Sequence, residues 1–484
     1  MRPSIMRHST LCALAVAALA TPVGADQGKP SRSALAPGSF AITDVTVIPM
    51  TGDATLRDAT VVVRDGRIAE IGATRNVKVP SGARRVNGRG KYLIPGLADM
   101  HTHLYSDGDV PDSVGKYELG VMLASGVTAT RLMIGTSEHF ALRRQVEAGN
   151  VAGPQLWIAS PQFTGKEDVN SRVVTTPEDA RAAVKEMAER GYDFIKLTLF
   201  ITPPVYDAIV EEAERRRIPV VGHVDPDVGV ARALRAGQQI EHLDNYLESV
   251  LADSAPMKTS VSDRGLFRPK YWESLDWIDD RKVERIAGET ARARIFTCPT
   301  LTVFKTAFAL GQSLDEIRSR PDWAIMPPEM RKLYLAAREK YWSQAASEER
   351  RMRYVEVRNR LVKAIADSGG KIMAGSDTPE WFFGYGWTIH RELESLVAAG
   401  LTPHQALAAA TRNPAEFLRA SKEWGTIEKG KRADLLLLDG NPLEDIRNTS
   451  RIEAVVLGGR WLDREERERM IAEAAERLGG EEVS

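Results

Sequence analysis

Short apolar runs alternate with amphipathic helical stretches through the middle of the chain, at about residues 98–423. There are eight such runs, which read GLADMHTHL, GVTATRLMIG, PQLWIASPQF, YDFIKLTLF, IPVVGHVD, QQIEHLDN, RIFTCPTLTVF and GGKIMAGSDT. Strands that are apolar on both faces and separated by helices are typical of parallel sheets, because helices cover both sides of such a sheet. Eight β/α repeats therefore predict an α/β fold, a closed (β/α)8 barrel of the TIM type.

The predicted barrel is longer than the roughly 250 residues of a typical one. Its extra length lies mainly at about 246–365, around the seventh run, where Trp, Tyr, Arg and Glu accumulate in helical sequence. We interpret this segment as a helical insertion over the mouth of the barrel. Solvated helices with no role in binding are an equal alternative.

The two ends of the chain have a different pattern, with short strands joined by tight turns. Asp65-Gly66 and Gly458-Gly459 stand between alternating apolar residues and are typical of β-hairpins. Neither end has enough strands for a core of its own, so we expect residues 26–97 and 424–463 to form one small β-sandwich domain. The highly charged residues 464–484 predict a helix that forms a solvated arm.

The first residues resemble a secretory signal peptide. Arg2 and Arg7 precede the apolar run at 11–20, and small residues follow up to Ala25. This three-part pattern predicts a signal peptide at 1–25 with cleavage near Ala25, and hence a periplasmic or secreted protein. A short membrane anchor is the alternative, but ten apolar residues cannot cross about 30 Å of hydrocarbon as a helix. No other segment is apolar for long enough to predict a membrane span.

Composition narrows the chemistry. The 65 Lys and Arg nearly balance the 66 Asp and Glu, which argues against a general nucleic-acid binder. Two cysteines in 484 residues exclude a disulfide framework and a zinc-type Cys cluster. We expect Cys298 to be a core residue, because it lies in an apolar run. A metal site in this chain must therefore use the eight histidines and the carboxylates.

Several polar residues stand toward the C-terminal ends of the apolar runs, where barrel enzymes build their active sites. They are His101 and His103 on the first run, Lys196 on the fourth, His223 on the fifth, His242 on the sixth and Asp377 on the eighth. Each alone is more often a hydrogen-bonded core residue. Together they would be costly to bury without a common partner, and a metal ion provides one. Imidazole and carboxylate ligands suit Zn²⁺, the default, or Mn²⁺, Co²⁺ or Ni²⁺.

These residues resemble the pattern of the amidohydrolase superfamily, in its two-metal type with a carboxylated lysine. GLADMHTHL, the lysine of the fourth run, the histidines of the fifth and sixth, AGSDT, and the closing segments NPAEFL and GTIEKGKRADLLLLDGNPL carry the resemblance. The chain is most similar to the imidazolonepropionase-like and Xaa-Pro dipeptidase-like branch. The resemblance covers nearly everything after residue 25.

The resemblance implies a ligand set. His101, His103 and Asp377 would hold one metal and His223 and His242 the other, with Lys196, carboxylated by CO₂, between them. Two metals in such a site share a water and generate a bridging hydroxide at neutral pH. Asp377 is then expected to be the catalytic base that takes the proton of this water and returns it to the leaving nitrogen.

The predicted function is a secreted, metal-dependent amidohydrolase that cleaves a C–N bond, with dipeptides and N-acyl amino acids as candidate substrates. Imidazolonepropionase uses one metal and no such lysine, so Lys196 counts against that activity. Asp225 stands where the dipeptidase branch tends to have a second histidine, which puts a peptide substrate in doubt. A lactonase or phosphotriesterase would use the same site. A catalytically silent binding or scaffold protein is the alternative of another class.

Substrate contacts are less specified by the sequence. The stretch TPEWFFGYGW after Asp377 suggests that Trp381 and Phe382 bind an apolar or aromatic group of a small-molecule substrate, and packing against the insertion is the alternative. Tyr105 and Tyr246 are further candidates. Arg131 would contact a substrate carboxylate or form an ion pair within the barrel.

We expect His390 to be structural and His139 and His404 to lie on helix surfaces. A homo-oligomer is compatible with this sequence.

Overall fold

The protein is described by a computed structural model that covers residues 39–104, 114–168, 170–255, 272–307, 313–342, 347–379, 382 and 384–480. The predicted signal peptide lies outside the described residues, and so do Tyr105 and Trp381.

Eight parallel strands form the barrel that the sequence predicts. They are β6 (Leu97–Thr102), β7 (Val127–Leu132), β8 (Gln155–Ile158), β11 (Ile195–Leu197), β12 (Val220–Gly222), β13 (Gln239–Glu241), β14 (Phe296–Cys298) and β15 (Lys371–Ile372). β6, β7 and β8 pair in that order, as do β11 to β15. Parallel bridges Ala159–Phe194 and Thr102–Thr378 join the two groups and close the ring. The short strands β9 (Gln162–Thr164) and β10 (Ser171–Val173) extend the third run beyond the barrel.

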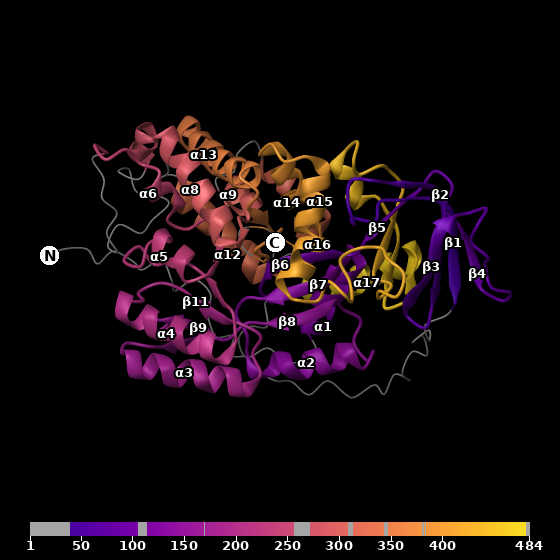
Figure 1. Ribbon diagram of the computed structural model, residues 1–484, viewed down its shortest axis with the longest axis horizontal. Helices are drawn as coiled ribbons and strands as arrows, with labels where there is room; N and C mark the ends of the chain where they lie inside the picture. Colours follow the sequence, from indigo (N-terminus) through magenta and orange to yellow (C-terminus); the bar gives the residue numbers. More distant parts are fainter. Residues whose placement is uncertain are drawn as a thin grey trace.

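The described helices lie around this ring or in the insertion that follows β14 (Figure 1). Those before β14 are α1 (Gly115–Ala124), α2 (Ser137–Glu147), α3 (Pro177–Arg190), α4 (Pro203–Arg216), α5 (Val230–Arg235), α6 (Tyr246–Ser249), η2 (Ser274–Trp277) and α8 (Asp280–Ala293). Those after it are α9 (Leu301–Ala307), α10 (Leu314–Arg318), α11 (Pro321–Ala324), α12 (Pro328–Trp342), α13 (Glu348–Asp367), α14 (Trp387–Ala398), α15 (Pro403–Ala409) and α16 (Arg412–Phe417).

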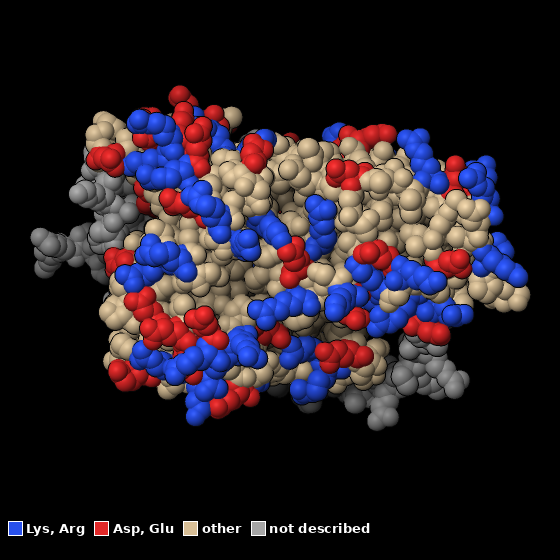
Figure 2. Space-filling model, viewed as in Figure 1, with Lys and Arg blue, Asp and Glu red and all other residues tan. Residues whose placement is uncertain are grey.

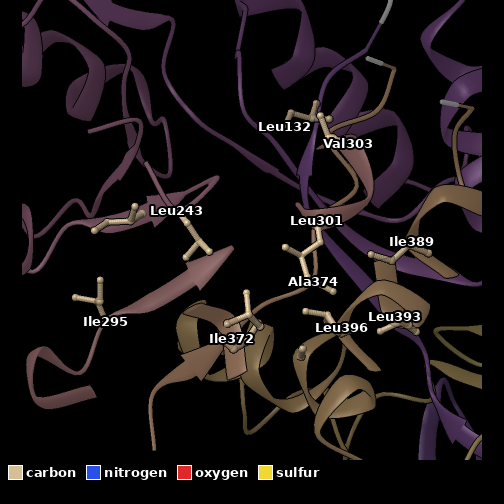
Figure 3. Close-up of a cluster of buried hydrophobic side chains, with 14 of the residues drawn as sticks. Leu132, Leu243, Ile295, Leu301, Val303, Ile372, Ala374, Ile389, Leu393 and Leu396 are labelled. Atoms are coloured by element: carbon tan, nitrogen blue, oxygen red, sulfur yellow. The ribbon is translucent and has the colours of Figure 1, made fainter. Parts of the chain in front are cut away.

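Local sequence explains where these helices begin and end. In α3 the Thr176 side chain accepts a hydrogen bond from the Asp179 amide, Pro177 occupies the first turn, and Gly191 ends the helix with φ 87°. Helix faces then supply the core. Ile389, Leu393 and Leu396 lie on one face of α14 and meet Leu301 and Ala374 in the buried cluster of Figure 3.

The two chain ends form a single sheet, seen in Figure 1 as indigo strands beside yellow ones. Its strands are β1 (Phe40–Val47), β2 (Leu56–Arg64), β3 (Arg67–Ala73), β4 (Arg84–Asn87), β5 (Tyr92–Pro95), β16 (Leu435–Leu438), β17 (Ile452–Leu457) and β18 (Arg460–Leu462). The order is β18-β17-β16-β5-β1-β2-β3, with β4 also pairing with β1. Asp65-Gly66 connects β2 to β3 and Gly458-Gly459 connects β17 to β18, all with positive φ, as the hairpin prediction requires.

Strand β16 shows how the sheet joins the barrel. Side chains on a strand alternate between two faces. Leu435 and Leu437 belong to the core that the sheet encloses, whereas Leu436 and Leu438 belong to the core of the barrel. One four-residue strand is therefore apolar throughout because both of its faces are buried.

The C-terminal segment is a helix, α17 (Arg464–Leu478), but it is not a solvated arm. Met470, Ala474 and Leu478 are buried, and α17 packs against α1. Arg467 donates to the carbonyl oxygens of Ala124 and Ile452, both at 2.6 Å. The charged sequence conceals this contact because only one residue in three or four faces the barrel.

Basic and acidic side chains intermingle over the face shown in Figure 2, in keeping with the formal charge of −1. Among the described helices, none combines the length and the apolar character needed to span a bilayer.

Candidate metal centre

The six polar residues that the sequence singles out meet at one end of the barrel. Nε2 of His101 and Nε2 of His103 each lie 3.2 Å from Oδ1 of Asp377, and Nδ1 of His242 lies 3.8 Å from Oδ2 of Asp377. The His101 and His242 rings are 4.6 Å apart between centroids, and the His223 and His242 rings 4.8 Å. His101, His242 and Asp377 each offer an atom within 4.8 Å of the others, a spacing that can hold a metal ion.

Backbone pairing places Asp377 beside the two histidines of the first strand. The Asp377 amide donates to the carbonyl oxygen of His101 at 2.7 Å, and the His103 amide donates to that of Thr378 at 2.7 Å. The i, i+2 spacing turns both imidazoles to the same side of the strand. The eighth strand therefore delivers one carboxylate to two imidazoles.

A second polar group orients each of three imidazoles. Nδ1 of His101 lies 2.6 Å from Oε2 of Glu241, and Nδ1 of His223 lies 2.7 Å from Oδ2 of Asp244. Nδ1 of His242 lies 2.8 Å from Oγ1 of Thr300. Such bonds hold the ring and leave Nε2 for a metal, a common arrangement in metal sites. These partners are not predicted from the sequence, although two of them, Glu241 and Asp244, are acidic residues of the same QQIEHLDN run as His242.

Arg131 does not face a substrate. Its side chain is fully buried; it forms an ion pair with Glu241 at 2.5 Å and donates to Gln239 Oε1 and the Met100 carbonyl oxygen, each at 2.7 Å. The substrate contact predicted from sequence was therefore wrong, and the alternative of an ion pair within the barrel is what the structure contains. A positive charge this deep needs the Glu241 carboxylate, because an unpaired buried charge is very costly.

Lys196 lies in the same cluster and is 1 % exposed. Burial lowers the pKa of Lys196, although the Glu241 and Asp377 carboxylates act in the opposite direction. Gly222, with φ 119°, leaves room for the lysine, since a Cβ there would lie 3.0 Å from Lys196 Cδ and 2.3 Å from the Leu197 carbonyl oxygen.

The charge states suit a divalent metal. Burial lowers the pKa of His101 to about 4 and that of His242 to about 3, so both rings are neutral and able to act as ligands at pH 7. Burial alone would raise the pKa of Asp377, but His101, His242 and His103 outweigh it and hold this pKa well below its usual range. The cluster thus combines neutral imidazoles, one ionised carboxylate and a buried lysine, which fits a metal centre.

Two of the remaining predicted substrate contacts, Tyr246 and Phe382, lie within the described residues, and both are packed against other side chains. Tyr246 is fully buried, and its hydroxyl lies 2.9 Å from Oγ1 of Thr290 rather than facing the cluster. Phe382 is 1 % exposed and packs between Trp323 and Tyr334, with ring centroids at 6.1 and 5.5 Å. For Phe382 the alternative, packing against the helical insertion, is therefore correct. Both residues are large and apolar, so burial stabilises them more than exposure at the mouth would.

Asp225, which departs from the dipeptidase pattern, has a structural role. Its Oδ2 accepts hydrogen bonds from the Phe200 and Ile201 amides at 2.5 and 3.2 Å. It therefore ties the loop after the Lys196 strand to the loop after His223.

The other residues set aside at the sequence level divide as follows. His390 is buried, with Nε2 2.9 Å from the Ser125 carbonyl oxygen, and Cys298 is buried, both as expected. His404 is half-buried, and its Nε2 lies 3.0 Å from the Gly52 carbonyl oxygen. It stands in the first turn of α15, which Thr402 caps as the sequence predicts. His139 is buried rather than on a helix surface, because its Nδ1 accepts the Thr136 amide in a helix cap.

With this geometry in place, comparison with known proteins decides the family. The family model described as "Amidohydrolase family" matches residues 92–462. The chain belongs to the amidohydrolase family. The family prediction and the barrel fold are thereby confirmed.

Relatives of this amidohydrolase family member carry several names. An imidazolonepropionase of Ralstonia nicotianae is 46 % identical over 198 residues, which cover 40 % of this chain and 47 % of the relative. The ochratoxinase of Aspergillus niger is 24 % identical over 461 residues, which cover 83 % and 81 %. The chain spans about half or less of the length of the curated imidazolonepropionases that it matches.

Two solved structures are similar over most of their length. A putative prolidase from Bifidobacterium longum is 25 % identical with a TM-score of 0.64, covering 90 % of this chain and 99 % of that one. A bottromycin amidohydrolase has a TM-score of 0.71 at 24 % identity and covers 91 % of each chain. The second likeness speaks for the fold alone.

Proposed function

We propose that this protein is a metal-dependent hydrolase that cleaves a carbon–nitrogen bond of the amide type in a small molecule. The observation that carries the proposal is Lys196, a buried lysine beside four imidazoles and the Asp377 carboxylate. A barrel has little reason to bury these groups together except to hold metal ions.

Two divalent ions, by default zinc, would occupy the site. His101, His103 and Asp377 would hold one, His223 and His242 the other, and carboxylated Lys196 would lie between them. When bound, the ions polarise a substrate carbonyl and lower the pKa of a bound water toward neutrality.

Lys196 is suited to carboxylation because its lowered pKa increases the fraction of free amine. The amine nitrogen attacks CO₂, one proton leaves, and a carbamate with one negative charge results. The product replaces a buried positive charge by a ligand, which removes the desolvation problem of the free lysine.

Asp377 is the residue best placed to move protons. It stays ionised, and its side chain is 12 % exposed, so a reactant can reach it. In the proposed reaction it accepts a proton from the attacking water and donates it to the leaving nitrogen. His103, 3.2 Å away, keeps the carboxylate in position.

The relatives favour an amide bond over other bonds. The putative prolidase bears the name of a C–N bond hydrolase. We therefore place dipeptides and N-acyl amino acids first among candidate substrates. Arg131 is paired with Glu241 and is unavailable for a substrate carboxylate, so other residues must bind that carboxylate.

A substrate screen tests this function. Metal-loaded protein lacking residues 1–25 is assayed with N-acyl amino acids, dipeptides, lactones and organophosphate triesters. We expect the highest kcat/KM with one of the first two classes. A preference for lactones or phosphotriesters would overturn the bond class, and binding without turnover of any substrate would overturn catalysis itself.

We also propose that the chain is exported by way of residues 1–25. The charged start, the apolar run and the small residues before Asp26 support this. Mass spectrometry of the protein purified from a periplasmic fraction should find an N-terminus at Asp26. An intact Met1 on the folded, active protein would overturn the proposal.

A further inference from the structure

Arg358, on α13 of the helical insertion, contacts the backbone of the predicted metal ligand His242. It is buried, and its Nη2 donates to the His242 carbonyl oxygen at 2.6 Å and to the Pro299 carbonyl oxygen at 3.1 Å. One guanidinium nitrogen therefore bridges the segments that follow β13 and β14.

The bridge begins where the strand ladder ends. The last ladder contact is the His242 amide, which donates to the Cys298 carbonyl oxygen at 2.9 Å. Beyond this bond the segments after β13 and β14 no longer pair as strands, and their buried carbonyl groups need another hydrogen-bond donor. Arg358 provides that donor for both segments.

The two carbonyl groups belong to strained backbone. His242 and Leu243 have φ values of 56° and 52°, and Thr300, directly after Pro299, has φ 46°. Residues with a side chain rarely adopt this left-handed region and persist in it only where surrounding contacts enforce it. Arg358 bonds the peptide groups at these positions, so it is one of the contacts that enforce the conformation.

These backbone segments orient both histidines of the second predicted metal. Thr300 holds Nδ1 of His242 at 2.8 Å, and the positive charge of Arg358 interacts with Asp244, which holds His223. The histidines of the first metal are carried by another strand: His101 lies on β6, and His103 follows directly after it.

Arg358 is itself held rigidly. Its guanidinium lies 3.5 Å from the ring centroid of Phe304 on α9, and Nη1 donates to the Tyr354 hydroxyl at 3.3 Å, one turn earlier on α13. Lysine has neither the planar group that stacks on Phe304 nor the second nitrogen that bonds Tyr354, so it cannot replace Arg358 without loss.

We propose that Arg358 is a positioning residue for the metal held by His223 and His242. The inference rests on the proposed two-metal function and deepens it. It also assigns a role to α13: this helix of the insertion fixes the backbone that follows β13 and β14, next to the metal centre.

Metal titration tests the inference with Zn²⁺, and with Co²⁺ as a spectroscopic probe, on wild type, Arg358→Met, Arg358→Lys and Arg360→Gln. Arg360 lies on the same helix, is partly exposed and pairs with Asp280, so it serves as the matched control. We expect two metals per chain in wild type and in Arg360→Gln. In Arg358→Met the first metal should bind as in wild type, and the second about 10- to 100-fold more weakly, with a changed Co²⁺ absorption band. Arg358→Lys should lie between the two.

The outcomes separate the two proposals. Fewer than two metals in wild type would overturn the two-metal function and this inference with it. Two metals in wild type, with unchanged second-metal affinity in Arg358→Met, would overturn the inference alone. If Arg358→Met does not fold, Arg358→Lys decides, because this variant keeps the charge but loses the Phe304 stacking and the Tyr354 bond. Wild-type affinity for both metals in Arg358→Lys would contradict the positioning role.

Discussion

Oε2 of Glu241 lies 2.6 Å from Nδ1 of His101, while Oε1 of the same carboxylate lies 2.5 Å from the guanidinium of Arg131. Both side chains of this ion pair are fully buried. One carboxylate therefore neutralises a charge inside the barrel and fixes the ring of a predicted metal ligand. Burial alone would raise the pKa of Glu241, but Arg131 and His101 outweigh it and keep the group ionised.

Replacing Glu241 tests this double role. Glu241→Gln should cost about 3–5 kcal/mol of unfolding free energy, because Arg131 is left as an unpaired buried charge. It should also weaken metal binding about 10- to 100-fold. Urea unfolding and metal titration measure the two effects. Glu423→Gln, which removes a carboxylate from the exposed Arg67 pair, is the control and should change stability by about 0–1 kcal/mol. Equal losses in the two variants would contradict the assignment.

Asp377→Asn should lower kcat by about 10²–10⁴-fold, since the amide cannot accept the proton of the attacking water. The metal content of the assayed sample, measured by mass spectrometry, distinguishes this loss from loss of a ligand. Hydrolysis at the wild-type rate with metals bound would show that Asp377 is not the base.

Lys196→Met should reduce both metal content and activity, the latter by at least about 100-fold, because the predicted bridging ligand is gone. Addition of acetate or propionate should restore part of the activity, since a short carboxylate can take the place of the carbamate. The same substitution at the partly exposed Lys371, which pairs with Glu416, should leave activity unchanged. A fully active Lys196→Met variant would exclude a bridging lysine.

His390 provides a pH test away from the metal centre. Burial lowers its pKa to about 4 from the ordinary value of 6.5. Between these two pH values the unfolded chain binds a proton that the folded protein does not, so this residue destabilises the fold progressively as pH falls from 6.5 to 4. The full effect is about 3 kcal/mol. Urea unfolding of wild type and His390→Gln at several pH values should show the two stabilities converging as the pH drops. A pH-independent difference would contradict the shift.

Much of the fold could be read from the sequence because it rests on local rules. Eight apolar runs separated by helical stretches predict the barrel, and period-two alternation with Asp-Gly and Gly-Gly turns predicts the hairpins of the end sheet. The same logic placed His101, His103, Lys196, His223, His242 and Asp377 at strand ends. Residues at the same ends of parallel strands are brought together by the topology alone.

Partners from distant segments could not be read in this way. The sequence left Arg131 with two roles, and only the packed barrel decided for Glu241, 110 residues away. Arg358 lies 116 residues from His242, on a helix whose sequence reads as solvated surface. The burial of the apolar loop residue Phe382 also depends on distant segments, because Phe382 packs against Trp323 and Tyr334 of the insertion.

What the sequence determined by itself was the set of strands, turns and chemically competent side chains, since each depends on neighbours within a few residues. The tertiary structure decided which polar group satisfies which buried charge and which faces of β16 and α17 are covered. Those outcomes depend on desolvation, and the cost of desolvation is set by whichever partner the fold brings within about 3 Å.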